Sequence, residues 1–159
     1  MKRILWLMLL AMPLLVVAQS RIYEGRSTSS SDVVMTFDGK RVYKGRSANS
    51  SDVLYTFDGK YLYSGKSTYS SDVILTFDGK RIYDGKSTYS SDVLYTFDGN
   101  YLYSGKSNST SDVILTYDGK RIYKGKSTNS SDVLYTTDGQ VPILVLVTLL
   151  PMFMKHIMM

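Results

Sequence analysis

The chain has no cysteine, one histidine and three prolines among its 159 residues, and its single tryptophan is Trp6. Without cysteine there can be no disulfide bond, thiolate metal site or thiol nucleophile. The lone histidine, His156, lies in the C-terminal tail, away from any serine-rich segment. A Ser-His-Asp triad or a histidine-rich metal centre needs more than this. We therefore predict no catalytic residue, no cofactor and no metal from composition.

A block of one charge sign is also missing. Of the 19 Lys and Arg residues, Lys2, Arg3 and Lys155 lie near the ends, and the other 16 alternate with all 14 Asp and Glu residues. Binding to the phosphates of a nucleic acid requires many cations on one face. Mixed-sign patterning indicates a solvated surface instead. We expect no nucleic-acid partner.

The first 18 residues, MKRILWLMLLAMPLLVVA, pair two cations with an uncharged apolar run and end in Val16-Val17-Ala18. This pattern predicts a signal peptide over 1–18, with a mature protein that begins near Gln19. An uncleaved membrane anchor is the alternative. Both imply export, so we expect a periplasmic, cell-surface or extracellular protein.

The C-terminal segment 141–159, VPILVLVTLLPMFMKHIMM, differs from everything before it. Its uncharged run, 141–154, is shorter than the roughly 18–20 residues that cross a bilayer, and Pro142 and Pro151 interrupt a helix. We expect a hydrophobic cap that closes an apolar end of the preceding domain, because repeat arrays need atypical ends. The alternative is a membrane-associating tail.

A 20-residue unit occurs six times in succession between residues 21 and 140, without insertion or deletion. These copies make up the predicted repeat domain, 19–140. Its consensus is [R/Y][I/V/L]Y-x-G-[K/R]-S-x-x-[S/T]-S-D-V-x-x-T-x-D-G-x. Tyr23, Gly25, Asp32 and Asp38 recur every twenty residues in all six copies. Such a period means that each unit meets its neighbours in the same way.

Each unit predicts a β-hairpin, because DVLYTF and YLYSG are rich in β-branched and aromatic residues and Asp58-Gly59 separates them. We expect these two residues to form a type I′ turn, both with positive φ. That turn places Phe57 opposite Lys60, whereas a longer loop would shift the pairing. The polar stretches, such as KSTYSSD at 66–72, connect the hairpins.

The fold class follows as all-β, with antiparallel hairpins in tandem. A β-solenoid with one coil per repeat and a closed barrel are the alternatives. Apolar side chains on both faces of the first strand indicate that both faces are covered. The last strand, 132–137, is left to pair with Val141-Pro142-Ile143, where Pro142 would stop the sheet at an edge.

The repeated aspartates have structural explanations, as turn residues and as acceptors in a serine-rich loop. Calcium binding is the alternative for them, but calcium loops concentrate several oxygen ligands within a dozen residues. Here an apolar strand separates the two aspartates of each unit. Six near-identical units also provide no single pocket of unlike groups, so we expect no enzyme.

Tyrosine is the most suggestive residue, with 14 copies, all in the repeats. The six in register with Tyr23 suit strand packing. Tyr69 and Tyr89 lie in the polar loops instead, and they are the candidate ligand-binding residues. Exposed aromatic rings beside Lys, Arg and Ser hydroxyls could stack on sugars and bind their hydroxyl groups.

At the level of the motif STYSSDVLYTFDG, found at 87–99, the chain resembles uncharacterised secreted bacterial proteins built of tandem units of this type. The resemblance implies export and no particular activity. Choline-binding repeats share only the unit length, because their ligand cages use tryptophan. We therefore predict a multivalent binding or adhesion module for surface carbohydrate or another extracellular polymer. The alternative is a purely structural protein of the cell envelope.

Overall fold

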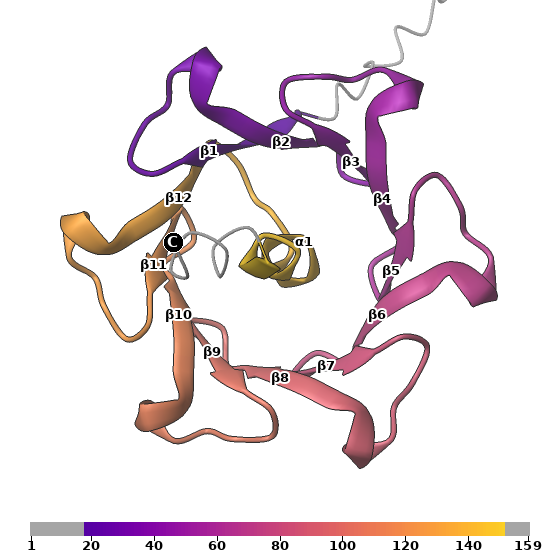
Figure 1. Ribbon diagram of the computed structural model, residues 1–159, viewed down its shortest axis with the longest axis vertical. Coiled ribbons are helices and arrows are strands. Elements are labelled where there is room, and N and C mark those ends of the chain that lie inside the picture. The colour runs from indigo at the N-terminus through magenta and orange to yellow at the C-terminus, as the bar shows by residue number, and fades with distance from the viewer. Residues whose placement is uncertain (1–17, 152–159) are drawn as a thin grey trace, which may run out of the picture.

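The computed structural model describes residues 18–151, and these form a closed barrel of twelve antiparallel strands around one short helix (Figure 1). The signal peptide predicted for 1–18 lies almost entirely outside the described residues. The strands are β1 (Ser20–Glu24), β2 (Val33–Phe37), β3 (Arg41–Lys44), β4 (Val53–Phe57), β5 (Tyr61–Ser64), β6 (Val73–Phe77), β7 (Arg81–Asp84), β8 (Val93–Phe97), β9 (Tyr101–Ser104), β10 (Val113–Tyr117), β11 (Arg121–Lys124) and β12 (Val133–Thr137). The helix is α1 (Ile143–Val147).

The all-β prediction with tandem hairpins is confirmed, and the closed barrel is the arrangement that the hairpins adopt. Neither an open array of hairpins nor a solenoid forms, because every strand from β1 to β12 pairs with a neighbour on each side. A closed barrel has no free edge, which removes the aggregation risk of an unpaired strand.

The tight turns differ from the predicted ones by one position. The N–H of Asp58 donates to the carbonyl of Tyr61 at 3.2 Å, and Phe57 lies opposite Leu62 rather than Lys60. Only Gly59 has positive φ in this turn, at 100°. The Asp58 carboxylate accepts the N–H groups of Lys60 and Tyr61, at 3.0 and 2.7 Å. This capping keeps the aspartate in the hairpin stem, so the prediction that both turn residues have positive φ is wrong.

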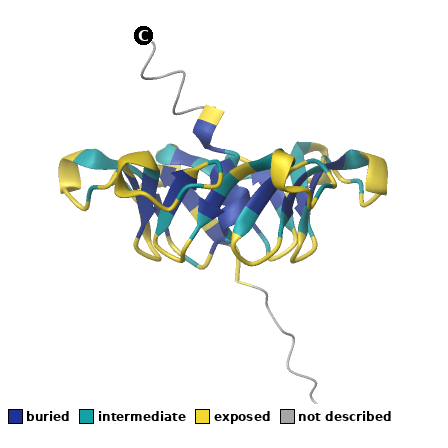
Figure 2. Ribbon diagram, turned by 90° about the horizontal axis from the view of Figure 1, so that it is seen from below, coloured by how far each residue is buried: buried dark blue, intermediate teal, exposed yellow. Residues whose placement is uncertain are grey.

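The longer connections form six outer loops at the opposite end of the barrel from the tight turns, and they splay outward (Figures 1 and 2). We number the outer loops first to sixth along the chain; they span 25–32, 45–52, 65–72, 85–92, 105–112 and 125–132. Each ends in a 3₁₀ turn: η1 (Ser30–Asp32), η2 (Ser50–Asp52), η3 (Ser70–Asp72), η4 (Ser90–Asp92), η5 (Thr110–Asp112) and η6 (Ser130–Asp132). We call the two ends of the barrel the loop end and the turn end.

On its outer side, each unit of the barrel carries a buried tyrosine and a buried threonine. In one unit, Tyr63 is 7% exposed and its hydroxyl donates to Asp58 at 2.7 Å. Thr56, 1% exposed, donates to the carbonyl of Gly65 at 2.8 Å and so fixes the start of the outer loop. Gly65 has φ of 61°, a conformation that glycine adopts without strain. The same bonds recur in each unit, which explains the in-register residues by packing.

The lumen is apolar and holds α1. The second residue of each unit, such as Leu62, points inward and is fully buried. A bulge between Leu62 and Tyr63 sets two residues of the next strand against one, and both residues of such a pair, Ile74 and Leu75, pack against the core. This bulge is why apolar residues occur on both apparent faces of the first strand in each unit.

The segment that follows β12 enters the lumen as a plug. All five residues of α1 are buried, and Leu144 and Val145 are fully so. Such a helix, apolar on every side, needs a fully apolar surrounding. The pairing predicted between 132–137 and Val141-Pro142-Ile143 does not form, because β1 occupies that edge of β12. Among the described residues, no helix is long and apolar enough to cross a membrane.

The barrel closes at a seam between its first and last strands. Ile22 lies opposite Thr137, and the N–H of Arg21 donates to the Asp138 carboxylate at 2.5 Å. The hydroxyl of Tyr23 donates to the same carboxylate at 2.8 Å. These are the bonds that Asp58 makes inside a hairpin, but here the partners are 115 or more residues apart. The first and last units therefore complete one another.

Candidate functional site

Tyr69 and Tyr89 occupy equivalent places at the tips of the third and fourth outer loops, where each precedes a 3₁₀ turn. Each is 76% exposed, and the third exposed large hydrophobic residue of the described chain is Leu94, at 37%. The structure therefore places both candidate residues at the surface.

Serine and aspartate side chains fix the backbone beneath these tyrosines. In the fourth loop, the Ser87 hydroxyl accepts the N–H of Tyr89 at 3.1 Å and donates to the Asp92 carboxylate. The hydroxyl of Ser91 donates to the other Asp92 oxygen at 2.7 Å. The hydrogen bonds from Ser87 and Ser91 lower the pKa of Asp92 below its ordinary value. The loop is thus a preorganised support for an exposed ring.

A lysine bridges the two loops that carry the tyrosines. The Lys86 ammonium, at the start of the fourth loop, donates to the Ser70 hydroxyl of the third loop at 2.8 Å. Ser70 follows Tyr69, and Lys86 precedes Tyr89 by three positions. We call these four residues, Tyr69, Ser70, Lys86 and Tyr89, the paired-tyrosine junction.

The same bridge recurs at the two neighbouring junctions, but with one tyrosine each. Lys66 donates to Ser50 at 3.3 Å and Lys106 donates to Ser90 at 3.1 Å. The position of Tyr69 is held by other residues in the remaining loops, namely Ser29, Asn49, Ser109 and Asn129. One of the six junctions therefore carries an exposed tyrosine on each of its two loops.

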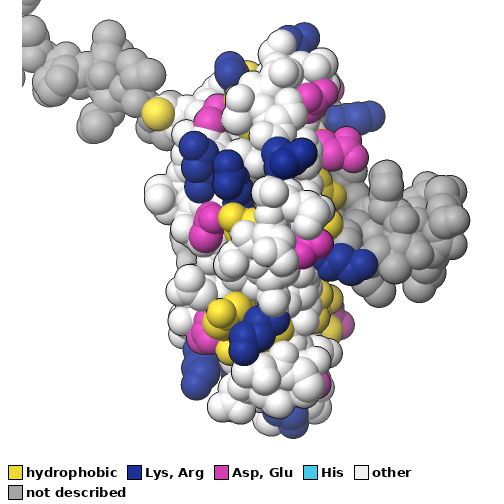
Figure 3. Space-filling model, turned by 90° about the vertical axis from the view of Figure 1, so that its left-hand side faces the viewer, with side chains coloured by type: hydrophobic (Ala, Val, Ile, Leu, Met, Phe, Trp, Pro, Cys, Tyr) yellow, Lys and Arg dark blue, Asp and Glu magenta, His cyan; other side chains and the backbone are white. Residues whose placement is uncertain are grey.

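Sequence reasoning missed the lysine of this junction. The signal was present as the basic residue at the sixth position of every unit, which is exposed in all copies: Arg26, Arg46, Lys66, Lys86, Lys106 and Lys126. On the side of the barrel near β11 and β12, cationic and anionic side chains are interspersed over the surface (Figure 3). The bridging bond could not be foreseen, because it depends on the distance between two consecutive loops in the folded chain.

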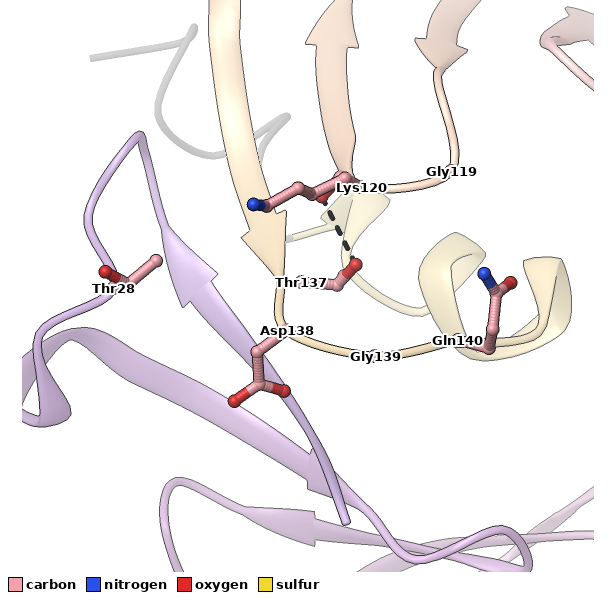
Figure 4. A pocket seen from close by; sticks show the side chains of 7 residues that line it. All are labelled: Thr28, Gly119, Lys120, Thr137, Asp138, Gly139 and Gln140. Carbon is pink, nitrogen blue, oxygen red and sulfur yellow. Dashed lines mark hydrogen bonds between the residues drawn. The ribbon is translucent and has the colours of Figure 1, made fainter. Parts of the chain in front are cut away.

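A hollow of about 340 Å³ lies at the seam, lined by Thr28, Lys120, Thr137, Asp138 and their neighbours (Figure 4). Thr137 donates to the Lys120 carbonyl at 3.2 Å (Figure 4). Asp138 already accepts hydrogen bonds from the closing strand β1. The polar groups here hold the barrel shut, which is a structural role.

Two apolar hollows flank the plug on the side of β4, β6 and β8. One, of about 350 Å³, lies between Tyr55, Leu75 and Tyr95 on the wall and Leu150 on the plug. The other, of about 400 Å³, lies between the phenylalanines of these strands, Phe57, Phe77 and Phe97, and the start of the plug. Across the described residues, no three Asp, Glu or His side chains lie close enough to hold a metal ion.

The comparison with protein-family models supports this architecture. The model described as "6-fold beta flower protein" matches residues 9–107. No curated protein and no solved structure matches the chain. The matched segment covers more than half of the sequence, and the six repeated hairpins with their outward loops fit the description. The chain therefore belongs to the 6-fold beta flower family.

Proposed function

We propose that this protein is an exported, non-catalytic binding module that holds a surface carbohydrate or another extracellular polymer at its outer loops. The observation that carries the proposal is the exposure of Tyr69 and Tyr89 on adjacent loops. Exposed aromatic rings lose apolar hydration when a sugar ring stacks on them, and tyrosine gives this area at low entropic cost.

The rest of the molecule supports a scaffold rather than a catalyst. The repeated Asp, Ser and Thr side chains are engaged in hydrogen bonds that shape turns and loops. Catalytic groups usually need perturbed partners that converge on one cavity. Here the two cavities beside the plug are apolar.

Export is supported by the position of the first strand. The predicted cleavage after Ala18 would release a chain that starts at Gln19, just before β1 (Ser20–Glu24). Every barrel strand would remain in the mature protein. We propose a periplasmic, cell-surface or extracellular location on this basis.

A glycan array probed with the purified protein tests the function. The variant Tyr69→Asn/Tyr89→Ser uses residues that the second and fifth loops carry at this position, so its fold should be unchanged. We expect wild-type protein to retain a subset of glycans and the double variant to lose them. Asn129→Ser in the sixth loop is the matched control and should bind like wild type. Absence of binding by wild-type protein would favour the alternative, a structural component of the envelope without a ligand.

A further inference from the structure

The charge at the paired-tyrosine junction points to a narrower class of ligand. Lys86 is exposed, and its one hydrogen bond to another described residue is with the neutral hydroxyl of Ser70, at 2.8 Å. An ammonium group has three donors. One is used in the bridge, so two remain for a ligand or solvent, and the bridge holds the positive charge beside Ser70, the residue that follows Tyr69.

The acids of the same loops are occupied by their own serines. Asp92 accepts from Ser87 and Ser91, and Asp72 accepts from Ser67 and Ser71. Asp72 and Asp92 are half-buried, whereas Lys86 is exposed. Within the third and fourth loops, the exposed charged side chains are therefore Lys66 and Lys86.

We propose that the paired-tyrosine junction binds an anionic saccharide, with the sugar rings on Tyr69 and Tyr89 and the acidic group paired with Lys86. This inference rests on the proposed function and names its ligand class. A carboxylate and a sulfate offer the same acceptor chemistry to an ammonium group. The two junctions that hold one tyrosine each, at Lys66 and Lys106, extend the row of cations along a polymer.

The test compares saccharides that differ only in charge. Biolayer interferometry would measure binding of the purified protein to an immobilised neutral glucose oligomer, to the same oligomer oxidised at C6 to the uronate, and to its sulfated form. Binding should be about fivefold tighter to the acidic forms, as expected for one exposed ion pair. This preference should shrink when salt is raised, because exposed charges are screened. The uronate and sulfate arms identify which acidic group fits better.

Variants at one repeated position locate the effect. Lys86→Gln should remove most of the preference for the acidic oligomers, whereas Lys126→Gln, at the same position of the sixth unit, should leave it unchanged. Equal binding of neutral and acidic oligomers, together with an unaffected Lys86→Gln variant, would overturn the anionic class and leave the proposed function standing. An equal loss from Lys126→Gln would overturn the junction as the site. If none of the three oligomers binds, the inference fails, whereas the proposed function is decided by the glycan array.

Discussion

At the residue scale, one tyrosine donates a hydrogen bond to one aspartate at each of the six repeated turns. Tyr63 donates to Asp58, and this bond raises the pKa of Tyr63 to about 12. Burial alone would raise the pKa of Asp58, but the N–H of Tyr61 and the hydroxyl of Tyr63 outweigh it and lower that pKa. The pair is stable as a neutral phenol with an ionised carboxylate.

This pair predicts how stability depends on alkaline pH. The ordinary pKa of tyrosine is 10.0, below the folded value of about 12. Below pH 10 the stabilisation is complete, and it is lost as the pH rises to about 12 because the unfolded chain releases its proton first. The free energy of unfolding in urea should fall over this window. Tyr63→Phe removes one of the repeated pairs and should make that fall shallower, and the exposed Tyr69→Phe should not; equal slopes for the two variants would contradict the assignment.

At the element scale, the seam between β1 and β12 pairs the two strands that lie farthest apart in the chain. Inside a hairpin, Asp58 and Tyr61 are three residues apart, whereas Asp138 and Arg21 are separated by 117. Loop entropy grows as about (3/2)RT ln n, so closing the seam costs about 3 kcal/mol more than closing one hairpin. The barrel should therefore open first at β1.

A glycine at the seam allows this closure to be tested. A Cβ added at Gly139 would lie 2.3 Å from the Ser20 hydroxyl oxygen and 3.1 Å from its Cβ. Gly139→Ala should therefore displace β1 and cost about 1–3 kcal/mol, as overpacking does. Urea unfolding measures the loss, and hydrogen exchange should rise most in β1.

The matched control removes the obstacle. In a Ser20→Gly background, the further change Gly139→Ala should cost much less, because no side chain remains at position 20. A full cost in that background would show that contact with Ser20 is not the cause.

The strands and their spacing were predictable from the sequence, but closure and turn register were not. The Asp58 carboxylate accepts the backbone N–H groups two and three residues later. This local hydrogen bonding shifts the turn by one position. Closure did leave a trace in the sequence. The first unit starts with the second-strand motif at Arg21, and no copy of the first-strand motif precedes it in the sequence, while the last unit ends after Asp138-Gly139 without a following Arg-Ile-Tyr. The two half-units are complementary.

The candidate tyrosines were predictable because they interrupt polar loops, whereas their partner Lys86 was not. Its bridge to Ser70 depends on the distance between adjacent loops in the ring. The helix α1 was not predicted either, because it too depends on the closed barrel. Val141-Pro142-Ile143 has strand character, but β1 already pairs with β12, and the apolar lumen stabilises a helix that is apolar on every side.

At the scale of the whole molecule, the number of units and the plug are matched. The twelve strands enclose α1, whose Leu144, Val145 and Leu146 are at most 1% exposed. Barrel diameter grows roughly linearly with strand number. A chain that lacks residues 61–80 would have ten strands, and the register would be kept because Lys60 would precede Arg81, as Lys40 precedes Arg41.

The ten-strand lumen would be narrower by about a sixth, and we expect this to crowd a helix that is about 10 Å wide with its side chains. Truncation after Gln140 should therefore have opposite effects in the two chains. In the natural chain it should lower the melting temperature, since each buried leucine of the plug contributes about 2 kcal/mol. In the ten-strand chain it should raise the melting temperature, because a plug that does not fit is removed. Thermal unfolding followed by circular dichroism decides this, and a fall of the same size in both chains would show that the match between lumen and plug has no influence on stability.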